Sequence, residues 1–86
     1  MLSDTEQRSA IYERLTATFR DLFNDPRLVL TDTMTAKDVA QWDSLNHINL
    51  IIAVEQMFGI RFLTAEIARL ANVGQFVDLI AQKLNH

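Results

Sequence analysis

The residues with the clearest potential for chemistry are Ser44, its neighbour Asp43, and His47 three positions further on. The tripeptide Asp43-Ser44-Leu45 lies where a long loop meets a long apolar segment, so Ser44 is expected at a helix N-terminus with its hydroxyl exposed. The free N–H groups and the positive end of the helix dipole would favour a phosphate ester there. Asp43 adds a carboxylate that a modifying enzyme could use, for example through a bound metal ion. Without further context, the alternative is a serine that only caps a helix.

Catalysis by this serine is not indicated. A nucleophilic serine requires a base within hydrogen-bond reach and an oxyanion hole. His47 is the only nearby base, and no Gly-x-Ser-x-Gly turn surrounds Ser44. A metal site is not indicated either, because the chain has no cysteine and its two histidines, His47 and His86, are far apart. We therefore predict a non-enzyme in which His47 is a polar surface residue at the rim of a binding site.

The elements that must position Ser44 begin with one long amphipathic helix. Ser3 and Glu6 have the spacing of a capping box, and the residues Asn24-Asp25-Pro26 end the helix. Its apolar stripe consists of Ile11, Leu15, Phe19, Leu22 and Phe23. A long connection, residues 26–43, follows and is of a length that is often functional. Within it, the apolar segment Leu28-Val29-Leu30 is expected to pack across the core. Residues 31–33 and 35–38 are expected to form turns, one of which could be a single turn of helix.

Three further helices are predicted after the loop. The second begins at Asp43 or Ser44 and is apolar nearly all the way round, which predicts a buried central helix closed by a left-handed C-cap at Gly59. Thr64 is expected to cap a short third helix from Ala65 to Leu70. A fourth helix begins after Asn72, with Gln75 in capping-box spacing. Its apolar stripe consists of Val73, Phe76, Val77, Ile80 and Leu84. The fold class is therefore all-α, a four-helix bundle of three longer helices and one short third helix.

Composition limits the classes of function. The chain has 86 residues, which is one domain over 1–86, and a net charge of −3 without clustered basic residues. Nucleic-acid binding is therefore not expected. The sequence contains no apolar run of the length that crosses a membrane, and its first residues do not resemble a signal peptide. We predict a cytoplasmic monomer that binds neither nucleic acid nor membranes.

Asp43-Ser44-Leu45 followed by an apolar helix resembles the attachment motif of the acyl carrier protein family. The resemblance continues through the segments 58–62, 64–70 and 72–80, and runs without a gap from about Leu45 to Ile80. It implies that Ser44 receives 4′-phosphopantetheine from coenzyme A and that Asp43 assists the phosphopantetheinyl transferase. It also implies that the thiol of the arm holds acyl groups as thioesters for acyl-loading and acyl-accepting enzymes of fatty-acid, polyketide or related biosynthesis.

The second helix differs from the fatty-acid carriers of this family. Asn46, His47 and Asn49 stand where acidic residues are usual, and Glu55 is the only acid of this helix after Asp43. Fatty-acid carriers of this family usually have a glycine-rich segment directly before the motif. This chain has Ala40-Gln41-Trp42 there instead. These differences suggest a stand-alone carrier of a specialised or secondary pathway. The resemblance also implies a partner-binding surface, and we assign to it Trp42, Leu45, Asn46, His47, Ile48 and Glu55. Ile48, Ile52 and Phe62 are candidates for a pocket that shelters an acyl chain, although core packing explains them equally well.

Several alternatives remain open on the sequence. The arm could carry aminoacyl or peptidyl groups, or the domain could have the carrier fold without being modified. Trp42 could be exposed, packed under the loop, or part of the docking surface. In a different class, residues 66–73 resemble the start of a DNA-binding helix-turn-helix, which would make the chain a small regulator. The helix that follows has one lysine and no arginine, which argues against base and phosphate recognition.

Overall fold

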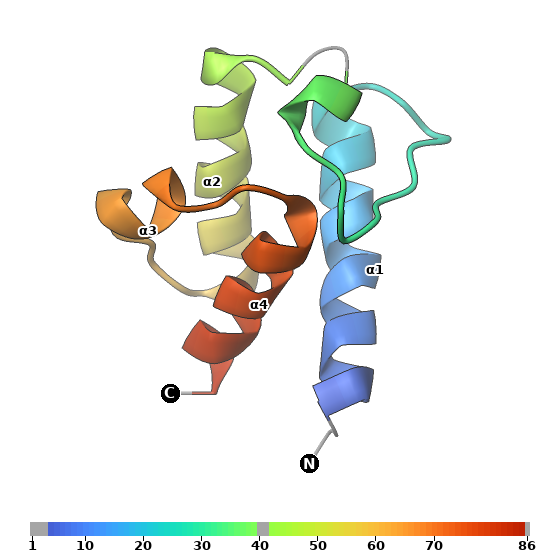
Figure 1. Ribbon diagram of the computed structural model, residues 1–86. Coiled ribbons are helices and arrows are strands. Elements are labelled where there is room, and N and C mark those ends of the chain that lie inside the picture. Colours follow the sequence, from blue (N-terminus) through green and yellow to red (C-terminus); the bar gives the residue numbers. More distant parts are fainter. Residues whose placement is uncertain (1–3, 40–41, 86) are drawn as a thin grey trace.

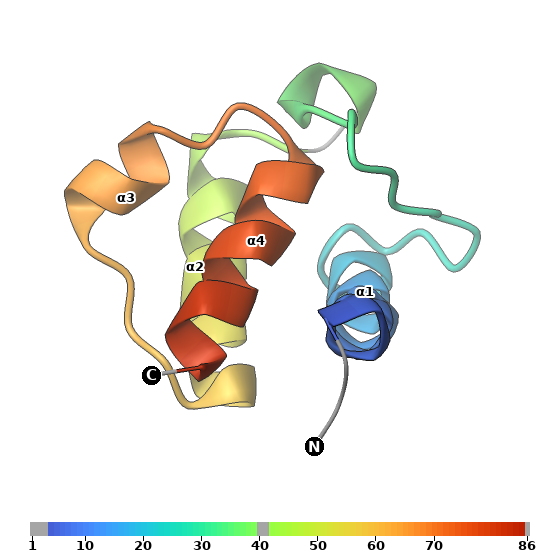
Figure 2. The same cartoon turned by 60° about the horizontal axis from the view of Figure 1, so that its bottom comes forward.

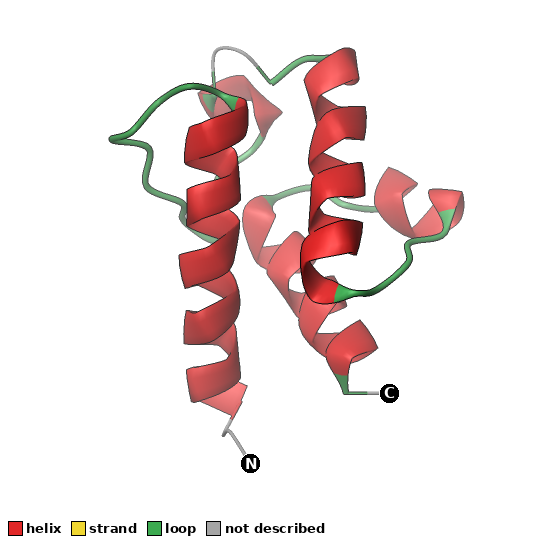
Figure 3. Ribbon diagram, turned by 180° about the vertical axis from the view of Figure 1, so that it is seen from behind, coloured by secondary structure: helices red, strands yellow, loops and turns green. Residues whose placement is uncertain are grey.

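The computed structural model describes residues 4–39 and 42–85, except for the side chains of Asp4 and Ser44. Its elements are α1 (Asp4–Leu22), the 3₁₀ turn η1 (Ala36–Asp38), α2 (Ser44–Phe58), α3 (Thr64–Ala68) and α4 (Val73–Leu84) (Figure 1). Loops join the helices, and the described part of the chain contains no strand (Figure 3). The predicted all-α bundle of three longer helices and one short one is confirmed.

The long helix α1 packs against both α2 and α4 through the predicted apolar stripe. Ile11, Leu15, Phe19 and Phe23 are buried, whereas Leu22 is only half-buried. At the far end of α2, the Arg14 guanidinium lies 5.1 Å from the centroid of the Phe58 ring. The short helix α3 lies on the opposite side of α2 and α4 from α1 (Figures 1 and 2). The core is therefore closed mainly by three helices, and α3 covers one flank.

Most helix ends follow the local sequence signals. Gly59 has φ 66° and ψ 37°, which confirms the left-handed C-cap of α2. The Asn72 side chain accepts a hydrogen bond from the Gln75 N–H at 2.9 Å, which confirms the cap of α4. The Gln75 side chain, however, accepts from the Ala71 N–H rather than from Asn72. The predicted capping box at Ser3 lies outside the described residues, as does His86.

The prediction for the third helix was wrong at both ends. Thr64 is the first helical residue, and Leu63 occupies the cap position. The N–H of Leu63 donates to the Glu66 side chain at 2.8 Å, so the cap is supplied from within the first turn. The helix also stops at Ala68 instead of Leu70. A threonine signal did not identify this start, because the N–H of the cap residue is bound by Glu66 three residues further on and Leu63 has no capping side chain of its own.

The long loop between α1 and α2 is fixed to the beginning of α4. The N–H groups of Val73 and Gly74 donate to the carbonyl oxygens of Met34 and Asp32, both at 2.9 Å. Leu30 is buried and Leu28 is half-buried, but Val29 is 63% exposed, so the prediction that all three press across the core was wrong for Val29. The predicted helical turn is η1, capped by the Thr35 hydroxyl. These contacts set the position from which the chain enters α2.

Helix α2 has an exposed apolar face rather than being buried nearly all round. Leu50, Ile51 and Val54 are buried, while Ile48 and Ile52 are 57% and 47% exposed. The expectation of a helix buried all round was therefore wrong, and so was the assignment of Ile48 and Ile52 to the core. The reason is that α1 and the other elements cover one side of α2 but leave the side that begins at Leu45 open to solvent.

Candidate functional site

The N-terminus of α2 is organised by Asp43. Its backbone is extended, and Oδ1 accepts a hydrogen bond from the Asn46 N–H at 2.8 Å. The carbonyl oxygen of Asp43 accepts from the N–H of His47, also at 2.8 Å, and so begins the helical ladder. Ser44 is consequently the first residue of the helix, at one of the two predicted starts. Its side chain is outside the described part of the structure, so the predicted exposure of its hydroxyl stays a prediction.

Trp42 precedes this cap and is held on two sides. Its indole packs edge-on against Phe19, with the ring centroids 5.2 Å apart, and lies 6.0 Å from Phe23. The indole Nε1–H donates to Nδ1 of His47 at 3.0 Å, and the two rings stack at 25°. Trp42 is therefore half-buried and packed rather than exposed, and its place in a docking surface stays a prediction.

His47 is more than the surface residue that we predicted. It is half-buried, and its Nδ1 is the acceptor for Trp42. The sequence could not indicate this hydrogen bond, because it joins a loop residue to the helix across the Asp43 cap and no periodicity signals such a contact. In a neutral imidazole only one ring nitrogen can accept. With Nδ1 accepting from the indole, the neutral ring has no second lone pair to activate a serine hydroxyl. This geometry argues against a Ser44–His47 catalytic pair.

Two hollows adjoin the Trp42–His47 pair. An open groove of about 490 Å³ lies beside the start of α2 and is lined by Ala36, Trp42, Asp43, His47 and Ile48. A smaller and more enclosed cavity of about 120 Å³ lies behind the pair. It is lined by Thr35, Ala36, Trp42, His47, Leu70, Ala71, Asn72 and Phe76. Ala36, Trp42 and His47 are common to both linings, so the groove and the cavity adjoin at these residues.

The remaining residues assigned to a partner surface have different surroundings. Leu45 is 68% exposed and Ile48 is 57% exposed, and with Ile52 they follow one face of α2. Asn46 is half-buried beside the cap. Glu55 is also half-buried, and its carboxylate accepts a hydrogen bond from the Phe62 N–H at 2.9 Å. The structure thus brings Asp43, Leu45, Asn46 and Ile48 together around the start of α2, whereas Glu55 stabilises the loop at the other end.

The candidate acyl-pocket residues do not line a common cavity in the described structure. Ile48 lines the groove beside Asp43, and Ile52 lies in a separate hollow with Glu55 and Arg61. Phe62 instead packs on Phe76, with the ring centroids 5.6 Å apart. That these three residues shelter an acyl chain stays a prediction; in this structure Ile48 and Ile52 are exposed while Phe62 packs against α4.

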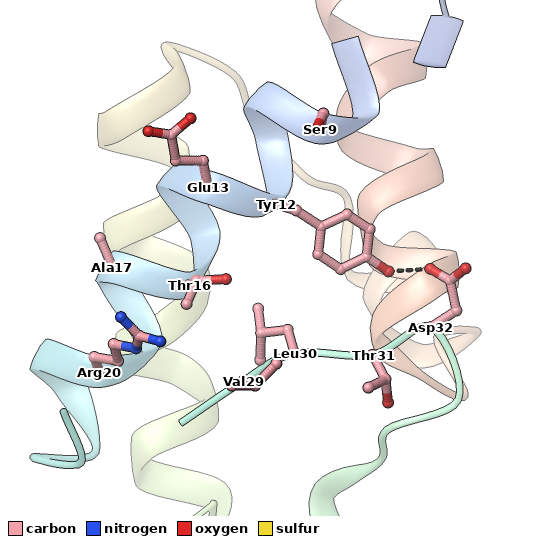
Figure 4. Close-up of a pocket in the computed structure, with 10 residues that line it drawn as sticks. All are labelled: Ser9, Tyr12, Glu13, Thr16, Ala17, Arg20, Val29, Leu30, Thr31 and Asp32. Atoms are coloured by element: carbon pink, nitrogen blue, oxygen red, sulfur yellow. Dashed lines mark hydrogen bonds between the residues drawn. The ribbon is translucent and has the colours of Figure 1, made fainter. Parts of the chain in front are cut away.

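A polar cluster that the sequence analysis did not identify fixes the loop to α1 and α4. Asp32 accepts hydrogen bonds from Arg8, at 2.7 Å, and from the Tyr12 hydroxyl, and Arg8 also pairs with Asp78. Burial and then the Asp32 hydrogen bond raise the pKa of Tyr12 to about 12. An open groove of about 600 Å³ lies next to this cluster, and the residues that line it belong to α1 and to the segment 29–32 (Figure 4). Because no α2 residue lines it, it is not part of the site at Ser44.

The ion pair between Lys83 and Glu66 connects α4 to α3. Nζ of Lys83 lies 2.8 Å from Glu66 Oε1 and 6.0 Å from the centroid of the Phe62 ring. The hydrogen bond from Lys83, followed by that from the Leu63 N–H, lowers the pKa of Glu66. Elsewhere, the described residues contain no group of three or more histidine, cysteine, aspartate or glutamate side chains that could hold a metal ion. They also contain no helix with the length and apolar character needed to cross a membrane.

The chain is similar to a solved structure over most of its length. This is the solution NMR structure of holo acyl carrier protein from Geobacter metallireducens, with 41% sequence identity and a TM-score of 0.83. The match covers 87% of this chain and 86% of that chain. No family model matches this chain, and neither does any curated protein.

Proposed function

This chain belongs to the acyl carrier protein family, and from that premise we propose that it holds acyl groups as thioesters on a 4′-phosphopantetheine arm attached to Ser44. Members of the family are carriers rather than enzymes. The similar structure is that of a holo carrier protein. The observation that carries the proposal is the position of Ser44 as the first residue of α2, directly after the Asp43 cap.

The surroundings of Ser44 fit the proposed group. The first N–H groups of a helix and its dipole favour an anion, which here would be the phosphodiester of the arm. The groove lined by Trp42, Asp43 and Ile48 begins beside this point and offers a largely apolar surface along which an extended arm could lie. The arm itself supplies a thiol that forms the thioester. The protein's residues orient the attachment point and present a docking surface.

Asp43 has two roles in the proposal. Its Oδ1 caps α2 and thereby fixes the backbone on which Ser44 stands. We further propose that its exposed carboxylate assists the phosphopantetheinyl transferase, for example by binding the metal ion of that enzyme. The two roles are separable, since asparagine caps a helix as well as aspartate but carries no charge.

The proposed partners are this transferase and the enzymes that load and accept acyl groups. Leu45 and Ile48, both mostly exposed, support a docking surface next to Ser44. We assign Trp42, Asn46, His47 and Glu55 to the same surface as a prediction. Since α2 has no acid in its first turn, we propose specialised partners rather than those of ordinary fatty-acid synthesis. That the carrier is a cytoplasmic monomer stays a prediction.

The helix-turn-helix alternative is wrong for a member of this family. The structure gives the physical reason. The helix that would have to enter the DNA groove is α4, and its residues Val73, Phe76 and Val77 are buried in the core. The helix before it, α3, has only five residues. The aminoacyl carrier alternative concerns the cargo alone and is distinguished by loading experiments.

The test is intact mass spectrometry of the protein incubated with coenzyme A, Mg²⁺ and a broad-specificity phosphopantetheinyl transferase. We expect a single adduct with the mass of the arm, which disappears in Ser44→Ala and persists in Ser9→Ala, a matched serine substitution on α1. We expect Asp43→Asn to be modified more slowly although its helix remains capped. The absence of any adduct, under conditions that modify a control carrier, would refute the proposal.

A further inference from the structure

The first turn of α2 carries Ser44, yet core packing holds this turn only weakly. None of the residues 45–49 is buried, and Leu50 is the first residue after them that belongs to the core. The two hydrogen bonds that Asp43 makes to backbone N–H groups of this turn are local. They shape the turn, but they do not fix its place relative to the other helices.

The Trp42–His47 pair connects this turn to α1. The indole Nε1–H donates to Nδ1 of His47 at 3.0 Å. The same indole packs on Phe19 of α1 and lies 6.0 Å from Phe23, measured between ring centroids. Trp42 stands two residues before Ser44 and His47 three residues after it, so the hydrogen bond closes a loop of backbone that contains Ser44. Through this bond, the core side chains of α1 help to fix the orientation of the turn.

We propose that Trp42 and His47 are positioning residues for the modification of Ser44, because their hydrogen bond holds the first turn of α2 in the orientation that the phosphopantetheinyl transferase requires. This inference rests on the proposed function. In the transfer, the Ser44 oxygen forms a bond to the phosphorus of the phosphopantetheine group of coenzyme A. The bond from that phosphorus to the leaving adenosine 3′,5′-bisphosphate breaks, and the hydroxyl proton passes to a base of the transferase. Such a displacement depends on alignment, since a misplacement of about 1 Å can cost about 100-fold in rate.

Positioning differs from docking and from general stabilisation in what it changes. Loss of alignment lowers the kcat of the transferase, because fewer bound carrier molecules present the turn correctly. Loss of a docking contact, as expected for the exposed Leu45 and Ile48, raises KM. Loss of a contact that only stabilises the fold lowers the free energy of unfolding and leaves both constants of the folded carrier unchanged. Kinetics and stability measured on the same variants therefore separate the three roles.

The experiment is steady-state kinetics of the apo protein with coenzyme A, Mg²⁺ and a broad-specificity phosphopantetheinyl transferase. Trp42→Phe keeps a ring against Phe19 but removes the N–H donor, and His47→Phe removes the acceptor. We expect each to lower kcat about two- to tenfold, the range for one neutral hydrogen bond. The double variant should be no slower than the slower single variant, because both substitutions remove the same bond.

A rescue variant and a matched control give the kinetics their meaning. In His47→Asn, the side-chain carbonyl oxygen can take the place of Nδ1 and accept from the indole N–H. This variant should therefore remain clearly faster than His47→Phe. The sequence has one other histidine, and His86→Asn makes the same substitution there. It should leave kcat and KM unchanged.

Hydrogen exchange shows whether the effect is confined to the turn. In Trp42→Phe, the amides of Asn46 and His47 should exchange faster, whereas the amide of Ile80, a residue of the core, should keep its protection. Faster exchange at Ile80 as well would indicate general loosening of the fold and overturn the inference.

Several kinetic results would also overturn it. These are an unchanged kcat in Trp42→Phe, a change confined to KM, additive effects of the two substitutions, or a His47→Asn variant as slow as His47→Phe. The absence of any adduct on the wild-type protein is a different result, because it would refute the proposed function itself. Modification of the wild type and the variants at equal kcat would refute the positioning role alone.

Discussion

Substituting Gly74 by alanine tests how the loop that leads into Ser44 is held. Gly74 is buried in the first turn of α4, and its N–H donates to the Asp32 carbonyl oxygen at 2.9 Å. A Cβ placed on Gly74 would lie 2.9 Å from that same oxygen and 3.0 Å from the Asp32 Cβ. Because the nearest atom belongs to the backbone, no side-chain rotation can relieve the contact, and the loop must move away from α4.

Three effects determine the magnitude. Forcing additional atoms into a packed contact costs about 1–3 kcal/mol, and weakening the Gly74 hydrogen bond costs about 1 kcal/mol more. Alanine returns at most about 1 kcal/mol through its higher helix propensity. The expected net loss of unfolding free energy is about 1–3 kcal/mol, which lowers Tm by about 5–15 °C in a domain of this size.

Urea denaturation and hydrogen exchange measure the two parts of this argument. We expect a lower free energy of unfolding and reduced protection of the amides of Val73 and Gly74. Gly59→Ala is the matched control, because a Cβ there meets nothing within 4 Å and only the left-handed backbone, φ 66°, is strained. It should destabilise without exposing those two amides. If the free energy of unfolding of Gly74→Ala were unchanged or higher, the predicted contact with Asp32 would cost less than alanine gains in helix propensity. The loop would then not be held tightly against α4.

Three further predictions concern the cap and two titrating groups. Asp43→Ala should lower the free energy of unfolding by about 0.5–2 kcal/mol in urea denaturation, whereas Asp43→Asn should stay within a few tenths; equal losses would contradict the capping role. The lowered pKa of Glu66 means that its pairing with Lys83 stabilises the fold above the ordinary value of 4.5 and that this contribution is lost as the pH falls through the lower, folded value. The stability difference between wild type and Glu66→Gln should therefore shrink below that range, and a difference independent of pH would contradict the ion pair. The raised pKa of Tyr12, about 12 instead of 10, means that the neutral phenol contributes stability that is lost as the pH rises above 10. Because the chain has one tyrosine, ultraviolet titration of the phenolate should show a midpoint well above 10, and an ordinary midpoint would contradict the hydrogen bond to Asp32.

Local signals in the amino-acid sequence determine where most helices of this protein begin and end. Pro26, Gly59 and Asn72 mark helix ends through backbone chemistry that acts within a few residues. The spacing of Ile11, Leu15 and Phe19 defines the buried face of α1. Helical periodicity is also a local property, so the sequence alone can show it. The start of α2 at Asp43 or Ser44, and with it the family resemblance, could therefore be predicted from the sequence alone.

Tertiary structure decided which of the apolar and polar side chains meet. Ile48 and Ile52 have the same hydrophobicity as the buried Ile51, but no other element covers their side of α2. The bond between Trp42 and His47 crosses a helix cap, and the approach of Asp32 to Gly74 joins residues about forty positions apart. Such contacts depend on how the loop and helices are placed in space, which periodicity and capping rules do not specify. The start of α2 is thus a property of the sequence, whereas the Trp42–His47 contact beside it is a property of the fold.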